Sequence, residues 1–136
     1  MRWFSGWLWV VGLAALLAMP GTAAAQYGHP LHGSWSGGWG KNQENRVLMN
    51  LDWDGKQISG QINPGPDALT VTQTDIDYSD PTAWKVKMQA EGKDKAGKPV
   101  KVTINGVLQN IEVYYKILRG TWTQNGVSAP FILTRN

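Results

Sequence analysis

Apolar and polar residues alternate along most of the chain after residue 33, in short runs that are separated by turn residues. Because successive side chains of a strand point to opposite faces, this period of two predicts β-strands with one buried face. The clearest run is 84–91, where the apolar members are Trp84, Val86, Met88 and Ala90. No segment keeps a 3.6-residue apolar period long enough to predict a helix, so the pattern indicates an all-β protein.

Eight such runs follow one another, over residues 33–39, 46–53, 57–63, 69–78, 84–91, 100–108, 112–124 and 129–135. Asp54 and Gly55 between the second and third runs favour a tight hairpin turn, since this pair readily adopts the positive φ angles of a type I′ turn. Strands joined by short turns pair with their neighbours and leave no exposed edge when they close on themselves. We therefore expect a single small antiparallel up-and-down barrel of about eight strands over residues 34–136.

Two runs depart from simple alternation. Leu69 and Val71 lie on one parity and Ile76 and Tyr78 on the other, which predicts a β-bulge near residues 73–75. In the run 112–124, one apolar set competes with another for the inner face, and a second bulge or a bend at Gly120 would reconcile them. The two sets are Val113, Tyr115 and Ile117 on one side and Tyr114, Leu118 and Trp122 on the other. The facing of both tyrosines therefore stays open.

The N-terminus predicts export. Arg2 precedes an apolar stretch from Trp7 to Met19, and Ala23 to Ala25 provide small residues for signal-peptidase cleavage. We expect residues 1–25 to be a signal peptide and residues 26–33 to form a flexible N-terminal segment, with an uncleaved anchor as the alternative. Because the stretch is shorter than the roughly 20 residues of a membrane crossing, the expected product is periplasmic or secreted and does not span a membrane once processed.

Composition narrows the classes of partner. The chain has 13 Lys and Arg residues, one of them Arg2 in the expected signal peptide, against 10 Asp and Glu, and it has no cysteine. Nucleic-acid binding needs cations clustered on one face, so this near balance favours no nucleic-acid partner. Without disulfides, the exported domain has to be stabilised by burial.

The two ends of the barrel region carry a resemblance to a known superfamily. Gly33, Ser34 and Trp35 have the form Gly-x-Trp on a first strand, and Arg135 ends the last strand. This pairing resembles the calycins, which comprise lipocalins, fatty-acid-binding proteins and avidins. The resemblance implies a calycin-like barrel in which Trp35 packs beneath Arg135 as a structural pair, with a cation–π contact at the barrel floor.

The avidin branch is similar in length and in the ending 131–135, but the resemblance does not extend to its ligand. Residues 35–39 do not supply the polar set with which an avidin holds the ureido ring of biotin. The resemblance therefore implies a fold and leaves the ligand open.

Aromatic residues are the candidates for a ligand site, since a cluster of them lining one cavity suits an apolar or aromatic small molecule. Trp39 and Trp53 are the best candidates for a rim position, because both end strands beside polar turns. The expected ligand-binding residues are Trp39, Trp53, Trp84, Tyr115 and Trp122. The alternative is that these side chains fill the core, and that the protein is a non-enzymatic interaction module that binds a protein or glycan partner through its outer face or loops.

Metal and cofactor sites are not predicted. Asp75, Asp77 and Asp80 have a spacing that could serve calcium, but the glycine and terminal glutamate of an EF-hand loop are absent, which favours a solvated strand edge. His29 and His32 could bind a transition metal, yet no third ligand lies near them in sequence.

Catalytic chemistry is not predicted either. The chain has no cysteine and two histidines, both near the expected mature terminus, so no nucleophile and base are paired by sequence. The carboxylates that could act in pairs do not converge, because their predicted places are outer faces or turns. These candidates are Asp52, Asp54, Glu91 and Glu112. We expect a binding protein and not an enzyme.

Overall fold

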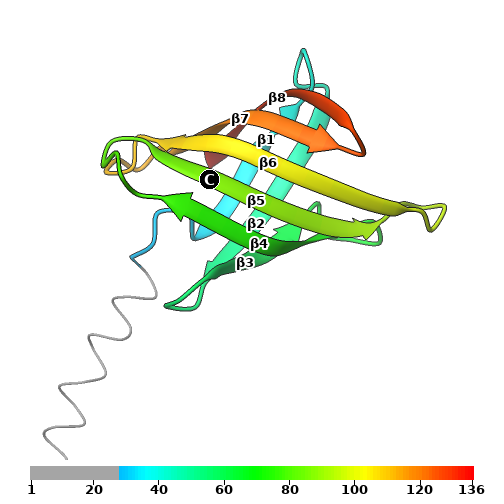
Figure 1. Cartoon of the computed structure of the whole chain (residues 1–136), viewed down its shortest axis with the longest axis horizontal. Helices are drawn as coiled ribbons and strands as arrows, with labels where there is room; N and C mark the ends of the chain where they lie inside the picture. Colours follow the sequence, from blue (N-terminus) through cyan, green and yellow to red (C-terminus); the bar gives the residue numbers. More distant parts are fainter. Residues whose placement is uncertain (1–27) are drawn as a thin grey trace, which may run out of the picture.

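Eight antiparallel strands close into a barrel in the computed structural model, which describes residues 28–136 (Figure 1). Each strand pairs with the next, and the last pairs with the first, so no strand edge is left open. The predicted barrel is confirmed, whereas the predicted signal peptide lies outside the described residues. The strands are β1 (Gly33–Trp39), β2 (Asn45–Trp53), β3 (Ile58–Ile62), β4 (Leu69–Asp77), β5 (Trp84–Lys93), β6 (Pro99–Gln109), β7 (Ile117–Gln124) and β8 (Val127–Arg135).

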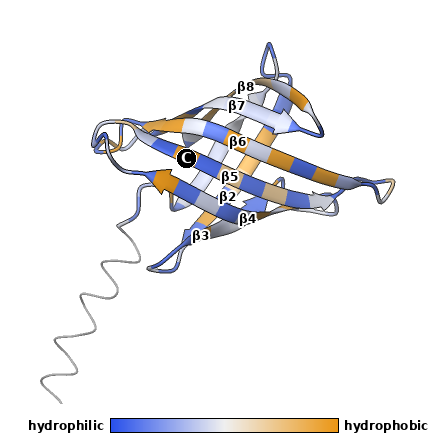
Figure 2. Cartoon of the chain, viewed as in Figure 1, coloured by the Kyte–Doolittle hydropathy of each residue, from blue (hydrophilic) through white to orange (hydrophobic). Residues whose placement is uncertain are grey.

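The period of two sorts side chains between the inside and the outside of the barrel. In β5, Val86, Met88 and Ala90 are buried while the residues between them are exposed, and Figure 2 shows the corresponding alternation of hydropathy along the strands. All buried side chains among residues 28–136 are hydrophobic. Burial of this apolar surface is therefore the main stabilising term of the fold. Within the same residues, no helix has the length and apolar character that crossing a membrane requires.

The seam between β1 and β8 brings the two ends of the barrel together. Trp35 is the register partner of Arg135 and is fully buried. Gly33 leaves room for the arginine, because a Cβ at this position would lie 2.7 Å from Nε of Arg135. Beyond the strand, Asn136 accepts a hydrogen bond from the Ser36 hydroxyl at 2.8 Å. The expected contact between the first and last strands is thus confirmed.

The two irregular runs have different explanations. The register of β4 against β5 shifts between Val71 and Gln73, which confirms the predicted bulge slightly earlier in the strand. The second run was predicted to be a strand over 112–124, and its first part is wrong: β7 begins at Ile117, and residues 112–115 are exposed in a loop. The apparent competition arises because Val113, Tyr114 and Tyr115 all belong to that loop, while Leu118 and Trp122 of β7 face the core.

Close packing at the seam makes Gly37 sensitive to substitution. A Cβ at Gly37 would overlap the carbonyl oxygen of Ile132 in β8. We expect Gly37→Ala to lower the free energy of unfolding by about 2–3 kcal/mol, because β1 and β8 have to separate. Ser34→Ala on the exposed face of the same strand is the control, with an expected change within about 0.5 kcal/mol. Urea unfolding followed by tryptophan fluorescence measures both, and equal losses would contradict close packing at the seam.

Candidate functional site

One end of the barrel is closed by residues 29–32, which precede β1. Leu31 is fully buried, and its carbonyl oxygen accepts a hydrogen bond from the indole nitrogen of Trp35 at 2.9 Å. The His29 ring lies against Trp53 and Trp84, with ring centroids 4.5 and 5.9 Å apart. A flexible segment was expected over 26–33, but its described part instead packs on the barrel, because Leu31 adds apolar area to the core.

The two histidines of this closure accept hydrogen bonds from the backbone. Nδ1 of His29 accepts from the Leu31 N–H at 3.1 Å, and Nδ1 of His32 accepts from the Trp53 N–H at 3.1 Å. Nε2 of His29 lies 3.4 Å from the hydroxyl of Tyr78. These hydrogen bonds hold both rings against the backbone of the closed end.

The opposite end of the barrel is open and contains a hollow of about 460 Å³. Strand directions alternate around the barrel, so the last residues of β1, β3, β5 and β7 meet at this end. Its apolar lining comes from Trp39, Leu69, Ala96, Val100 and Trp122, and its polar lining from Asn63, Asp67, Lys93, Asp94, Lys95 and Gln124.

A pair of stacked indoles forms one wall of this hollow. Trp39 and Trp122 have ring centroids 5.8 Å apart and planes inclined by 9°, and Trp122 also packs edge-on against Phe131. Trp122 is 1% exposed, and its indole nitrogen donates to Oε1 of Gln124 at 3.2 Å. Because Trp122 is fixed by the core, it supports the half-buried ring of Trp39 at the solvent boundary.

The polar groups of the hollow divide into those that build turns and those that are available to a ligand. The Asp94 carboxylate accepts the backbone N–H groups of Ala96 and Lys98, both at 2.9 Å, and so stabilises the β5–β6 turn. By contrast, the side chains of Asp67, Lys93 and Lys95 have no hydrogen-bond or ion-pair partner among residues 28–136. Charges of both signs are therefore free at the open end.

The five expected ligand-binding residues do not gather in one place. Trp39 and Trp122 line the open end, whereas Trp53 and Trp84 contact His29 at the closed end. Tyr115 lies in the β6–β7 loop and is 72% exposed. Sequence reasoning also missed the free charged residues of the open end. Strand direction could have indicated them, because the turns after β3 and β5 must lie at the end where β1 finishes.

The candidate carboxylates do not form a catalytic pair. Asp52, Glu91 and Glu112 are exposed, and the Asp54 carboxylate accepts the N–H groups of Lys56 and Gln57 in its turn. Those hydrogen bonds lower the pKa of Asp54.

The aspartates that were weighed as calcium ligands hold local turns. Asp77 accepts from the Ser79 N–H, and Asp80 accepts from the Thr82 hydroxyl and N–H. Hydrogen bonding to the side chain and then to the backbone lowers the pKa of both carboxyl groups, by Ser79 at Asp77 and by Thr82 at Asp80. The part of the chain from residue 28 onward contains no group of three His, Cys, Asp or Glu side chains that could hold a metal ion.

Comparison with known proteins identifies no relative. No family model, no curated protein and no solved structure matches the chain. The resemblance to the calycins stays a hypothesis, and the site is interpreted from its own geometry.

Acid is expected to weaken the closed end. Burial, and to a smaller extent the charge of His32, lowers the pKa of His29. A lowered pKa means that the unfolded chain binds this proton more readily. The stabilising contribution is therefore present above the unfolded pKa of about 6.5 and is lost as the pH falls through the folded value.

The measurement compares the free energy of unfolding at pH 7.5 and 5.5 in the wild type and in His29→Phe, which keeps an aromatic ring and removes the titration. We expect a smaller loss on acidification in the variant. An identical loss in both proteins would show that His29 does not contribute to the pH dependence.

Proposed function

We propose that the protein is an exported, non-enzymatic barrel of the calycin type that binds a small aromatic molecule in its open mouth. The observation that carries the proposal is the hollow of about 460 Å³ beside Trp39. Its volume lies within the roughly 300–1,000 Å³ of small-molecule sites, and it combines an apolar wall with a few polar groups.

Trp39 is the proposed contact for the ring of the ligand. Its indole stacks on Trp122, which is locked by burial and by its hydrogen bond to Gln124. A rigid aromatic surface loses little conformational entropy when a ligand binds, so stacking contributes more of its energy to affinity.

The free polar groups would orient the ligand. Asp67 supplies an acceptor, and Lys93 supplies a donor. Gln124 uses Oε1 to hold Trp122, which leaves its amide N–H₂ group able to donate. The expected ligand is therefore an aromatic compound that carries both donor and acceptor substituents at its edge.

Binding without catalysis is proposed because of the residue types in the hollow. Its lining includes no histidine, cysteine, serine or threonine among the described residues. One of its two carboxylates, Asp94, is already committed to a turn. Export rests on the leader pattern ending at Ala25, which supports a periplasmic or secreted location.

An interaction module is the second candidate function. The inward side chains of the barrel form one continuous cluster of buried hydrophobic residues. A filled interior transfers binding to the outer face and the loops, where a protein or a glycan would be the partner.

Substitution of Trp39 tests the first proposal. In a fluorescence titration with a library of small aromatic compounds, we expect the wild type to respond and Trp39→Ala to bind at least about tenfold more weakly, the equivalent of about 1.4 kcal/mol of lost stacking. Trp53→Phe, at the closed end, is the control and should retain the affinity of the wild type.

Native mass spectrometry of freshly purified protein adds a test that needs no choice of compound. A bare mass together with no fluorescence response to any member of the library would rule out the small-molecule proposal. Equal weakening by Trp39→Ala and Trp53→Phe would place binding elsewhere.

A further inference from the structure

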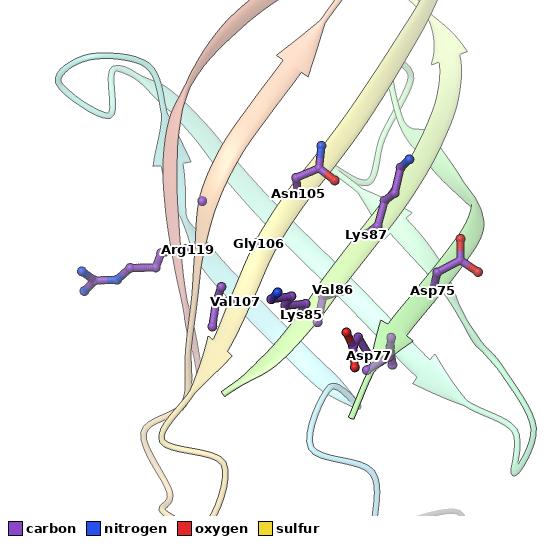
Figure 3. Close-up of a pocket in the computed structure, with 11 residues that line it drawn as sticks. Asp75, Asp77, Lys85, Val86, Lys87, Asn105, Gly106, Val107 and Arg119 are labelled. Atoms are coloured by element: carbon purple, nitrogen blue, oxygen red, sulfur yellow. The ribbon is translucent and has the colours of Figure 1, made fainter. Parts of the chain in front are cut away.

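The outer wall of the barrel carries an apolar depression next to the closed end. A hollow of about 470 Å³ crosses β4 to β7, with Ile76, Val86, Gly106 and Gly120 among its lining residues (Figure 3). A second hollow, of about 510 Å³, adjoins it over β6 to β8 and shares Val107, Arg119 and Gly120 with the first. Together the two hollows, here called the outer groove, extend over five neighbouring strands.

Arg119 lies at the junction of the two hollows. Val107 is in register with Lys85 on one side and with Arg119 on the other. Figure 3 shows the Arg119 side chain extending away from Lys85 and Lys87. The guanidinium has no hydrogen-bond or ion-pair partner among residues 28–136. The outer groove therefore combines an apolar surface with charged side chains, which are Arg119 and, farther along the hollow, Asp75, Asp77, Lys85 and Lys87.

The β6–β7 loop presents a complementary surface. Val113, Tyr114 and Tyr115 are 52%, 73% and 72% exposed, which is unusual for large hydrophobic side chains of one loop. Glu112 in the same loop is exposed and, like Arg119, has no partner among the described residues. The loop thus exposes three large apolar side chains beside one carboxylate.

Local contacts hold this loop in shape. The two tyrosine rings pack edge to face with centroids 5.2 Å apart. The ammonium group of Lys116 donates to the carbonyl oxygen of Val113 at 2.9 Å, and the Val113 N–H donates to the Asn110 carbonyl at 3.2 Å. A loop that is already ordered loses less entropy on association, so it is suited to an interface.

The loop and the outer groove lie side by side on one face of the molecule. Val107 is close to the end of β6, and Arg119 is close to the start of β7, the two strands that the loop joins. Because both halves of the complementary pair belong to the same face, a two-fold axis can place the loop of each copy on the groove of the other.

We propose that the protein forms a symmetric dimer in which the β6–β7 loop of each copy docks in the outer groove of the other. Tyr114 and Tyr115 pack on the apolar surface around Val107, and Glu112 of one copy pairs with Arg119 of the other. This arrangement gives a partner to the exposed tyrosines, to the apolar depression and to the charges of Glu112 and Arg119.

The expected contact area is sufficient for such a dimer. Each buried aromatic side chain removes about 150–250 Å² from water. Four tyrosines and the surfaces that they cover thus reach the roughly 1,200 Å² at which specific interfaces begin. The contact leaves the hollow at Trp39 uncovered, because that hollow is at the opposite end of the barrel.

A charge exchange tests the proposal. Sedimentation equilibrium of the mature protein should show a monomer–dimer equilibrium. Arg119→Glu and Glu112→Arg should each raise the dissociation constant at least tenfold, because each places like charges opposite one another. The double variant should restore dimerisation to within about threefold of the wild type, because it re-forms the pair with its charges exchanged. Arg46→Glu is the matched control, since Arg46 is an exposed cation on β2 outside the outer groove.

Further outcomes decide against the dimer. A protein that stays monomeric at the highest soluble concentration would overturn the proposal, as would a dimer that the two reversals leave unchanged or a double variant that is not rescued. Tyr114→Ser with Tyr115→Ser should also weaken the dimer, and circular dichroism would confirm that each variant keeps its fold. Ligand binding at Trp39 is measured in a separate fluorescence titration, so failure of one proposal does not affect the other.

Discussion

Pairing of the first strand with the last is the constraint on which the rest of the structure depends. Trp35 is fully buried beside this seam, with Arg135 of β8 as its register partner. The same contact turns an open sheet into a closed wall, so that inward side chains are surrounded by strands on every side. Because the wall is closed, the positions of both ends of the barrel are fixed, and with them the places where ligands or partners can approach.

The two ends of the barrel differ in structure, because one is covered by residues that precede β1 and the other contains a hollow. At one end, Leu31 and His29 cover the floor with residues that precede the first strand. At the other, Trp39 covers only part of the hollow, and charged side chains such as Lys93 lie around it. The segment 29–32 thus covers one end of the barrel, while a hollow occupies the other.

Alternation of apolar and polar residues was enough to predict the barrel and the bulge in β4, whereas the pairing of Trp35 with Arg135 was expected from the resemblance to the calycins. The barrel and the bulge follow from the alternation of buried and exposed residues, which can be recognised in short stretches of sequence. The site was predicted less well, because the pattern identifies a buried tryptophan without saying toward which end it points. Trp53 and Trp39 look equivalent in sequence, and only strand direction separates them. The prediction for Tyr115 failed for another reason. Its apolar neighbours have the spacing of a strand, but in the structure they lie in an exposed loop.

The distance in sequence between the two strands of the seam has a consequence for how the protein is made. Residues 35 and 135 are register partners, so the closing contact forms between nearly the first and nearly the last residues of the domain. Closing this seam costs more chain entropy than pairing neighbouring strands in a hairpin, so we expect it to form late in folding. The barrel cannot be completed while the chain is still being synthesised. A chain that has not yet paired β1 with β8 therefore keeps unpaired strand edges, which expose an incomplete or truncated barrel to aggregation.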